Sequence, residues 1–143
     1  MKWKPRIVVT DVDESRLLRM IETYRDKRDG ALAQELEAEL ANAEVVRSQA
    51  VPPHVVTMNS VVVYKDLDTG TLTTVELVYP SEARILNGRV SVLAPVGSAL
   101  LGLSVGQSIE WPMPSGHQKR ICVVRIPYQP ESARVEKERR GEA

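Results

Sequence analysis

The stretch Val51-Pro52-Pro53-His54 divides this chain of 143 residues into a helical part and a strand-rich part. Two adjacent prolines cannot continue a helix, and each favours extended backbone in the residue before it. Before this stretch the apolar residues recur at helical spacing, whereas after it short runs of β-branched residues alternate with turn residues. The sequence therefore predicts an α+β protein with a boundary between residues 51 and 52.

Upstream of the boundary, the pattern predicts two helices joined by a short polar turn. After an extended lead-in, Asp11 begins the first helix as its cap, with Asp13 as a rival cap. The second helix is expected from about Ala31 to Ser48, which at ~1.5 Å per residue reaches ~27 Å. Two amphipathic helices with so short a connection pack antiparallel, so residues 1–51 are predicted to form a coiled-coil helical hairpin.

The turn between these helices carries two carboxylates. It reads Asp26-Lys27-Arg28-Asp29 and is followed by Gly30. Carboxylates at a protruding tip can hold Mg²⁺ in the active site of a partner. The neighbouring cations compensate their charge, however, and we favour a solvated turn of mixed charge.

Downstream of the boundary, residues 52–130 predict a small antiparallel sheet with one short helix. Strands are expected over residues 55–58, 60–65, 71–79, 89–93, 108–111 and 119–128, and the helix over 95–103. Pro95 stands near the first turn of that helix, where a proline is tolerated. Residues 131–143 form a charged tail that we expect to be mobile, with a short helix as the alternative.

Composition excludes several classes of function. Lys and Arg number 19 and so do Asp and Glu, and this neutrality argues against electrostatic binding of DNA or a membrane surface. The single Cys122 excludes an internal disulfide and is expected to be a buried strand thiol. His54 and His117 stand alone in different loops, and the sequence shows neither a phosphate-binding glycine loop nor a metal-ligand cluster. We therefore expect no cofactor, no metal and no enzymatic activity.

No targeting or membrane segment is visible. The apolar run Ile7-Val8-Val9 is far shorter than the core of a signal peptide, and no stretch approaches ~20 apolar residues. We expect the protein in the cytoplasm.

Several motifs of the second part occur in the order of a known family. They are Val56-Thr57-Met58-Asn59-Ser60, Leu77-Val78-Tyr79-Pro80, Ala94-Pro95-Val96-Gly97-Ser98-Ala99-Leu100-Leu101-Gly102-Leu103, Ser108-Ile109-x-Trp111 and Tyr128-Gln129-Pro130-Glu131. Together they resemble the Rnk branch of the GreA/GreB family of bacterial transcription elongation factors. The resemblance extends from about Ile7 to Glu131.

The resemblance implies an N-terminal antiparallel coiled-coil hairpin, a C-terminal FKBP-like domain and a bacterial RNA polymerase as the partner. In Gre factors the C-terminal domain holds the rim of the secondary channel of the polymerase. The residues here that match the contact region are Leu93, Ala94, Pro95 and Val96. The hairpin tip of a Gre factor enters the channel, and its carboxylates help to bind the Mg²⁺ that cleaves backtracked RNA.

This chain departs from the Gre pattern at two points. Leu93 and Ala94 replace the acidic residue and serine that often precede the proline, which suits an apolar contact. The predicted hairpin is also shorter than a Gre hairpin, so a tip carrying Asp26 and Asp29 would not reach the catalytic Mg²⁺. The resemblance thus implies binding without efficient cleavage, competition with Gre factors, an indirect effect on nucleoside diphosphate kinase, and no direct DNA contact.

Two alternatives stay open at this stage. One is a peptidyl-prolyl isomerase or peptide-binding module of the FKBP type, which needs an aromatic-lined pocket. The chain has no Phe, and Trp111 and Tyr79 alone would not line such a pocket. The other is a cleavage-competent Gre factor that uses Asp26 and Asp29.

Overall fold

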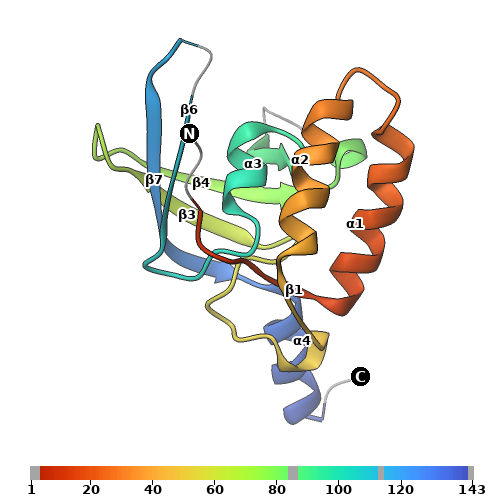
Figure 1. The fold of residues 1–143 in the computed structure, drawn as a ribbon. Helices are drawn as coiled ribbons and strands as arrows, with labels where there is room; N and C mark the ends of the chain where they lie inside the picture. The colour runs from red at the N-terminus through yellow and green to blue at the C-terminus, as the bar shows by residue number, and fades with distance from the viewer. Residues whose placement is uncertain (1–3, 84–86, 113–114, 142–143) are drawn as a thin grey trace.

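The computed structural model describes residues 4–83, 87–112 and 115–141, which form a helical N-terminal part beside a curled sheet (Figure 1). The helical and short strand elements of the first part are β1 (Val8–Thr10), α1 (Asp11–Tyr24), α2 (Gly30–Ala41), β2 (Glu44–Val46) and the 3-10 turn η1 (Ser48–Ala50). The second part contains β3 (Val61–Asp66), β4 (Leu72–Val78), η2 (Pro80–Glu82), β5 (Arg89–Ser91), α3 (Pro95–Leu100), β6 (Ser108–Pro112), β7 (Gln118–Tyr128) and α4 (Pro130–Arg139). The predicted mixture of helix and sheet is confirmed.

Helix α1 begins and buries its apolar side much as the spacing predicts, but with a different cap. The Thr10 hydroxyl, rather than Asp11, accepts the Asp13 backbone N–H at 3.0 Å. Leu17 and Ile21 are almost completely buried against the rest of the molecule. The helical stripe therefore fixes α1 to the core, and a hydroxyl takes the role that we assigned to a carboxylate.

Helix α2 ends at Ala41, so the expected helix to Ser48 is wrong. The chain turns out of the helix at Asn42, and β2 then pairs in parallel with β1, with Val45 beside Val9. This pairing joins residues more than thirty positions apart, and it overrides a helical apolar pattern that is only local. At 1.5 Å per residue, the two helical arms rise only ~21 Å and ~18 Å.

The main sheet has the strand order β5-β4-β3-β7-β6. Its pairs are antiparallel except β5, which runs parallel to β4, so the purely antiparallel sheet that we expected is wrong at this edge. The predicted strand over residues 55–58 is also wrong, because there only Val55 forms an isolated bridge, to Ser104. One face of the sheet supplies Val62, Leu77, Ile121 and Val123 to a core shared with α1, α2 and α3.

The C-terminal segment forms the helix α4, in agreement with the alternative that the sequence offered for the charged tail. Gln129 caps α4 by accepting the Ser132 N–H at 3.1 Å. The Gln129 side-chain amide also donates to the carbonyls of Pro52 and Val55, both at 2.8 Å. Figure 1 shows α4 at the opposite end of the molecule from the turn between α1 and α2.

No helix in the described ranges has both the length and the apolar character that a membrane span requires.

Candidate functional site

The start of α3 presents a small apolar surface. Pro95 is exposed at the first turn, Val96 is half-buried, and Ala94 is the half-buried cap whose carbonyl accepts the Ser98 N–H at 2.9 Å. Leu93, by contrast, is only 3% exposed and belongs to the core. Of the four residues that the sequence singled out, the surface here comprises Ala94, Pro95 and Val96.

Gly97 explains why this surface has a fixed position. A Cβ built on Gly97 would clash with the backbone carbonyl of Ser91, and would lie 3.2 Å from the Leu77 side chain. The same Ser91 carbonyl accepts the Ala94 N–H at 3.0 Å. Helix α3 therefore packs directly on the backbone at the end of β5, and only glycine permits this distance.

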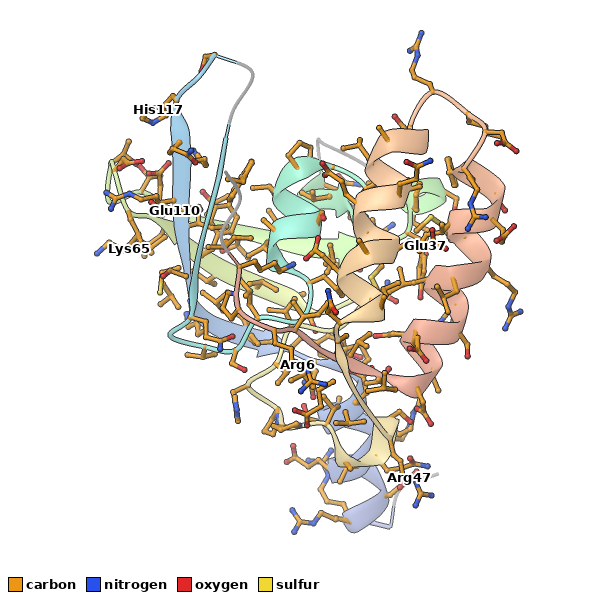
Figure 2. All side chains as sticks on the ribbon, viewed as in Figure 1. Arg6, Glu37, Arg47, Lys65, Glu110 and His117 are labelled. Carbon is orange, nitrogen blue, oxygen red and sulfur yellow. The ribbon has the colours of Figure 1, made fainter. Side chains whose placement is uncertain are left out.

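The turn between α1 and α2 is tight and its charges are partly paired. Lys27 donates its backbone N–H to the Tyr24 carbonyl at 3.1 Å, and its ammonium lies 5.4 Å from the centre of the Tyr24 ring. The Arg25 guanidinium contacts Glu37 at 2.7 Å and Glu22 at 3.1 Å. Glu37 lies on α2 next to α1 (Figure 2), so this ion pair joins the two helices directly below the turn.

The four predicted tip residues differ in exposure. Asp26, Lys27 and Arg28 are exposed, whereas Asp29 is half-buried at the start of α2 and its carbonyl accepts the Ala33 N–H at 3.0 Å. Within the described ranges, no three His, Cys, Asp or Glu residues come close enough together to hold a metal ion. The tip thus presents one exposed carboxylate between cations, and not a pair of outward carboxylates.

A second ionic contact joins α2 to α3. The Lys4 ammonium lies 2.6 Å from Glu39 Oε1 and donates to the Ser98 carbonyl at 2.6 Å. The Ser98 hydroxyl donates to Glu39 Oε2 at 3.3 Å. The side chains of Lys4 and Glu39 are only 7% and 17% exposed, so this contact fixes the hairpin beside α3 in a largely buried setting.

Sequence reasoning missed a buried polar group at the other side of the hairpin, which we call the junction cluster: Asp13, Thr57, Met58, Tyr79 and Glu131. The Met58 backbone N–H donates to Asp13 Oδ2 at 3.1 Å, and Thr57 Oγ1 donates to Glu131 Oε1 at 2.7 Å. Burial raises the pKa of Asp13 to about 6, although the Met58 hydrogen bond opposes this shift and Glu131 adds to it. The cluster joins α1, the turn over residues 57–60 and α4.

Tyr79 completes the junction cluster beside α1. Its ring lies 4.8 Å from the Arg16 guanidinium carbon. Burial, assisted by the Asp13 charge, raises the pKa of Tyr79 to about 12. In the part of the chain that the structure describes, the Tyr79 hydroxyl is buried without a hydrogen-bond partner.

The remaining predicted groups do not form a site with these residues. His54 and His117 are exposed, and Figure 2 shows His117 at the outer end of β7, far from α1. Cys122 is a free, half-buried thiol on β7 rather than a fully buried one. Trp111 and Tyr79, the aromatic residues considered for a peptide pocket, are only 7% and 8% exposed.

Two family models match this chain. The model described as "Transcription elongation factor, GreA/GreB, C-term" matches residues 51–128, and the model "Rnk N-terminus" matches residues 5–46. The N-terminal match ends at residue 46 and the C-terminal match begins at residue 51.

Individual proteins and one solved structure are similar over most of the chain or over a shorter share of it. The Escherichia coli K12 protein called "Regulator of nucleoside diphosphate kinase" is 40% identical over 132 residues, which is 91% of this chain and 95% of its own length. "Transcription elongation factor GreA" of Thermosipho africanus is 35% identical over 89 residues, 62% of this chain and 56% of its own. A GreA/GreB structure from Nitrosomonas europaea aligns with a TM-score of 0.70 and 42% identity, covering 87% of this chain and 100% of its own.

Proposed function

Because the chain belongs to the GreA/GreB family of transcription elongation factors, we propose that it binds bacterial RNA polymerase at the rim of the secondary channel, without efficient cleavage of the transcript. Family membership supports a transcription-factor-like regulator that acts through the polymerase. The apolar surface at the start of α3 supplies the contact with the rim, and the hairpin extends toward the channel. Such a protein works in the cytoplasm and meets DNA at most through the polymerase.

The observation that supports binding without cleavage is the short hairpin, whose tip carries carboxylates beside compensating cations. The two arms rise only ~21 Å and ~18 Å. Asp26 is exposed between cations, while Asp29 is half-buried at a helix start. A carboxylate assists metal-dependent cleavage only when it is held within reach of the metal, so a short hairpin with a half-buried Asp29 supports binding without efficient cleavage. Occupation of the channel then excludes Gre factors, and an effect on nucleoside diphosphate kinase follows indirectly.

The primary test is a titration of labelled protein against bacterial core RNA polymerase, repeated with an excess of GreA. We expect saturable binding that GreA displaces, since both proteins would occupy the same rim. No binding at micromolar polymerase would contradict the proposal. Binding that GreA leaves unchanged would place the contact elsewhere on the polymerase.

Replacing Pro95 by aspartate is expected to weaken polymerase binding by about tenfold, or roughly 1.4 kcal/mol. Pro95 is exposed, so the change adds a charge to the apolar surface without opening the core. Aspartate at a helix start is also compatible with α3. The matched control is Leu72→Asp, because Leu72 is 59% exposed on β4. If both variants bind equally well, the start of α3 is not the contact surface.

Replacing both Asp26 and Asp29 by asparagine is expected to leave transcript cleavage unchanged. The measurement follows shortening of the RNA in backtracked elongation complexes, with GreA as the positive control. We expect a rate close to that of polymerase alone for the native protein and for the double variant. Cleavage by the native protein that the double variant loses would instead establish a cleavage factor that uses these carboxylates.

A further inference from the structure

Asp13 is a buried ionisable group that the proposed contact with polymerase does not use. It is 5% exposed and lies in the first turn of α1, at the root of the hairpin. A carboxylate in a largely apolar setting is costly unless hydrogen bonds or opposite charges compensate it. The charges around Asp13 therefore decide which of its two protonation states favours the docked helix.

The hydrogen bond from the Met58 backbone joins α1 to a turn with a fixed shape. Asn59 has a positive φ of 69°, and Ser60 donates its N–H to the Thr57 carbonyl at 3.1 Å. The Ser60 hydroxyl also accepts the Thr57 N–H at 3.0 Å. This closed turn presents the Met58 N–H to the helix, and the partners are 45 residues apart in the chain.

The charged and titratable neighbours of Asp13 come from three sides. Arg16 is on the same helix, Tyr79 follows β4, and Glu131 is on α4. A hollow of about 370 Å³ beside Asp13 is lined further by Glu76 and Arg134. Glu131 is already fixed by the Thr57 hydroxyl, so ionised Asp13 faces a like charge in a partly buried setting, where the repulsion is only weakly screened.

We propose that Asp13 is a proton-dependent latch: α1 docks on the turn over residues 57–60 with the carboxyl neutral, and ionisation weakens this docking because burial and Glu131 disfavour the charge more than the Met58 hydrogen bond favours it. The neutral acid still accepts the Met58 N–H through one oxygen and gains an O–H donor. Glu131 and the Tyr79 hydroxyl, which has no hydrogen-bond partner among the described residues, are the polar groups near enough to influence Asp13 electrostatically. The latch thereby controls how firmly the root of the hairpin is held on the turn that leads into β3.

The direction of the pH dependence follows from comparing the Asp13 carboxyl in the docked helix with the same carboxyl exposed to solvent. When α1 is docked, burial raises the pKa of Asp13 to about 6, whereas a solvent-exposed aspartate titrates near ~3.9. Docking therefore binds a proton in this interval, and the contact is tighter at acidic pH and weaker above pH 6. Between pH 7.5 and pH 5 the docking equilibrium is expected to tighten roughly tenfold.

The experiment measures amide hydrogen exchange of the full chain at pH 5 and pH 7.5, corrected for intrinsic exchange rates. The exchange of the Leu17 and Ile21 amides reports the opening of α1. The exchange of the Ile121 and Val123 amides reports the opening of the sheet and serves as the reference. We expect α1 to lose about tenfold in protection at pH 7.5 relative to the sheet. An equal loss in both regions, or none in either, would overturn the latch. Because no polymerase is present, the result is separate from the test of the proposed function.

Two variants assign the effect to Asp13. Asp13→Asn keeps an oxygen for the Met58 N–H but removes the charge, so the protection of α1 should no longer depend on pH. Asp26→Asn, at the exposed tip, should retain the dependence of the native chain. If Asp13→Asn does not fold, the Met58 amide resonance of the native protein provides the test, with a titration midpoint expected near pH 6. A flat Met58 resonance, or a pH dependence that survives in Asp13→Asn, would contradict the proposal.

Discussion

Replacing Gly97 by alanine is expected to destabilise the protein by about 3 kcal/mol, because the added methyl group has no space. A Cβ at this position would overlap the Ser91 carbonyl. Helix α3 cannot simply move away, since the Ala94 N–H is bound to the same carbonyl and Leu100 of the helix is fully buried. Chemical denaturation should show a lower midpoint, and thermal unfolding a decrease of about 10 °C.

Gly106→Ala is the matched control for this substitution. Gly106 has a positive φ of 91°, but nothing lies within 4 Å of a Cβ built there. The control therefore measures backbone strain alone, which costs about 1–2 kcal/mol. Equal losses in the two variants would mean that the close approach of α3 to Ser91 is not what requires Gly97.

Replacing Glu39 by glutamine is expected to cost about 3 kcal/mol of folding free energy. The change removes the negative charge that lies 2.6 Å from the Lys4 ammonium, and the Lys4 side chain is only 7% exposed. A buried ammonium that loses its carboxylate carries a large desolvation cost, even though its hydrogen bond to the Ser98 carbonyl is retained. The free energy of unfolding in urea is the appropriate measurement.

Two further variants separate burial from charge in this prediction. Glu37→Gln alters another ion-paired glutamate of α2, but its side chain is 42% exposed, so the expected loss is below about 1 kcal/mol. Combining Glu39→Leu with Lys4→Met removes both charges and should restore most of the stability lost in Glu39→Gln. If Glu37→Gln and Glu39→Gln prove equally destabilising, burial of the Lys4–Glu39 pair is not the cause.

The sequence predicted those elements whose pattern is local. The spacing that includes Leu17 and Ile21 located α1, and both side chains are buried. The adjacent prolines lie between the hairpin and the main sheet, whose first strand in the chain is β3. The end of α2 was not predictable in this way, because the parallel pairing of β1 with β2 joins residues far apart in the chain. The apolar spacing that continues past Ala41 is local, and it does not reveal that the following residues pair with β1.

The apolar run over residues 55–58 illustrates a second limit. Its residues are buried as a strand would be, but they form an irregular connection that ends in a turn with Asn59 at positive φ. Periodicity over so few residues does not distinguish a buried strand from a buried turn. Asn59 itself was the available signal, since asparagine tolerates this conformation better than most residues.

The candidate surface was predictable from a motif, whereas the junction cluster was not recognised as a group, although all its members except Asp13 stand in the quoted motifs. Pro95 and Val96 stand in a recognisable motif at a helix start. Asp13, by contrast, reads as one more acidic residue in the first turn of a helix, where such residues are common. Its hydrogen bond to Met58 and its proximity to Glu131 depend on the packing of three separate segments.

The parallel pairing of β1 with β2 has a mechanical consequence. The strand that enters the hairpin and the strand that leaves it belong to the same ladder, with Thr10 beside Val46. Both legs of the hairpin are thus anchored at one base, in addition to the buried contacts along α1 and α2, so a tilt of the hairpin as a unit would turn about this base. A tilt of ~10° about that pivot displaces the end of a ~20 Å arm by only ~3–4 Å. Because the hairpin is short, a small tilt moves its tip only a little, and the position of the tip therefore stays well defined.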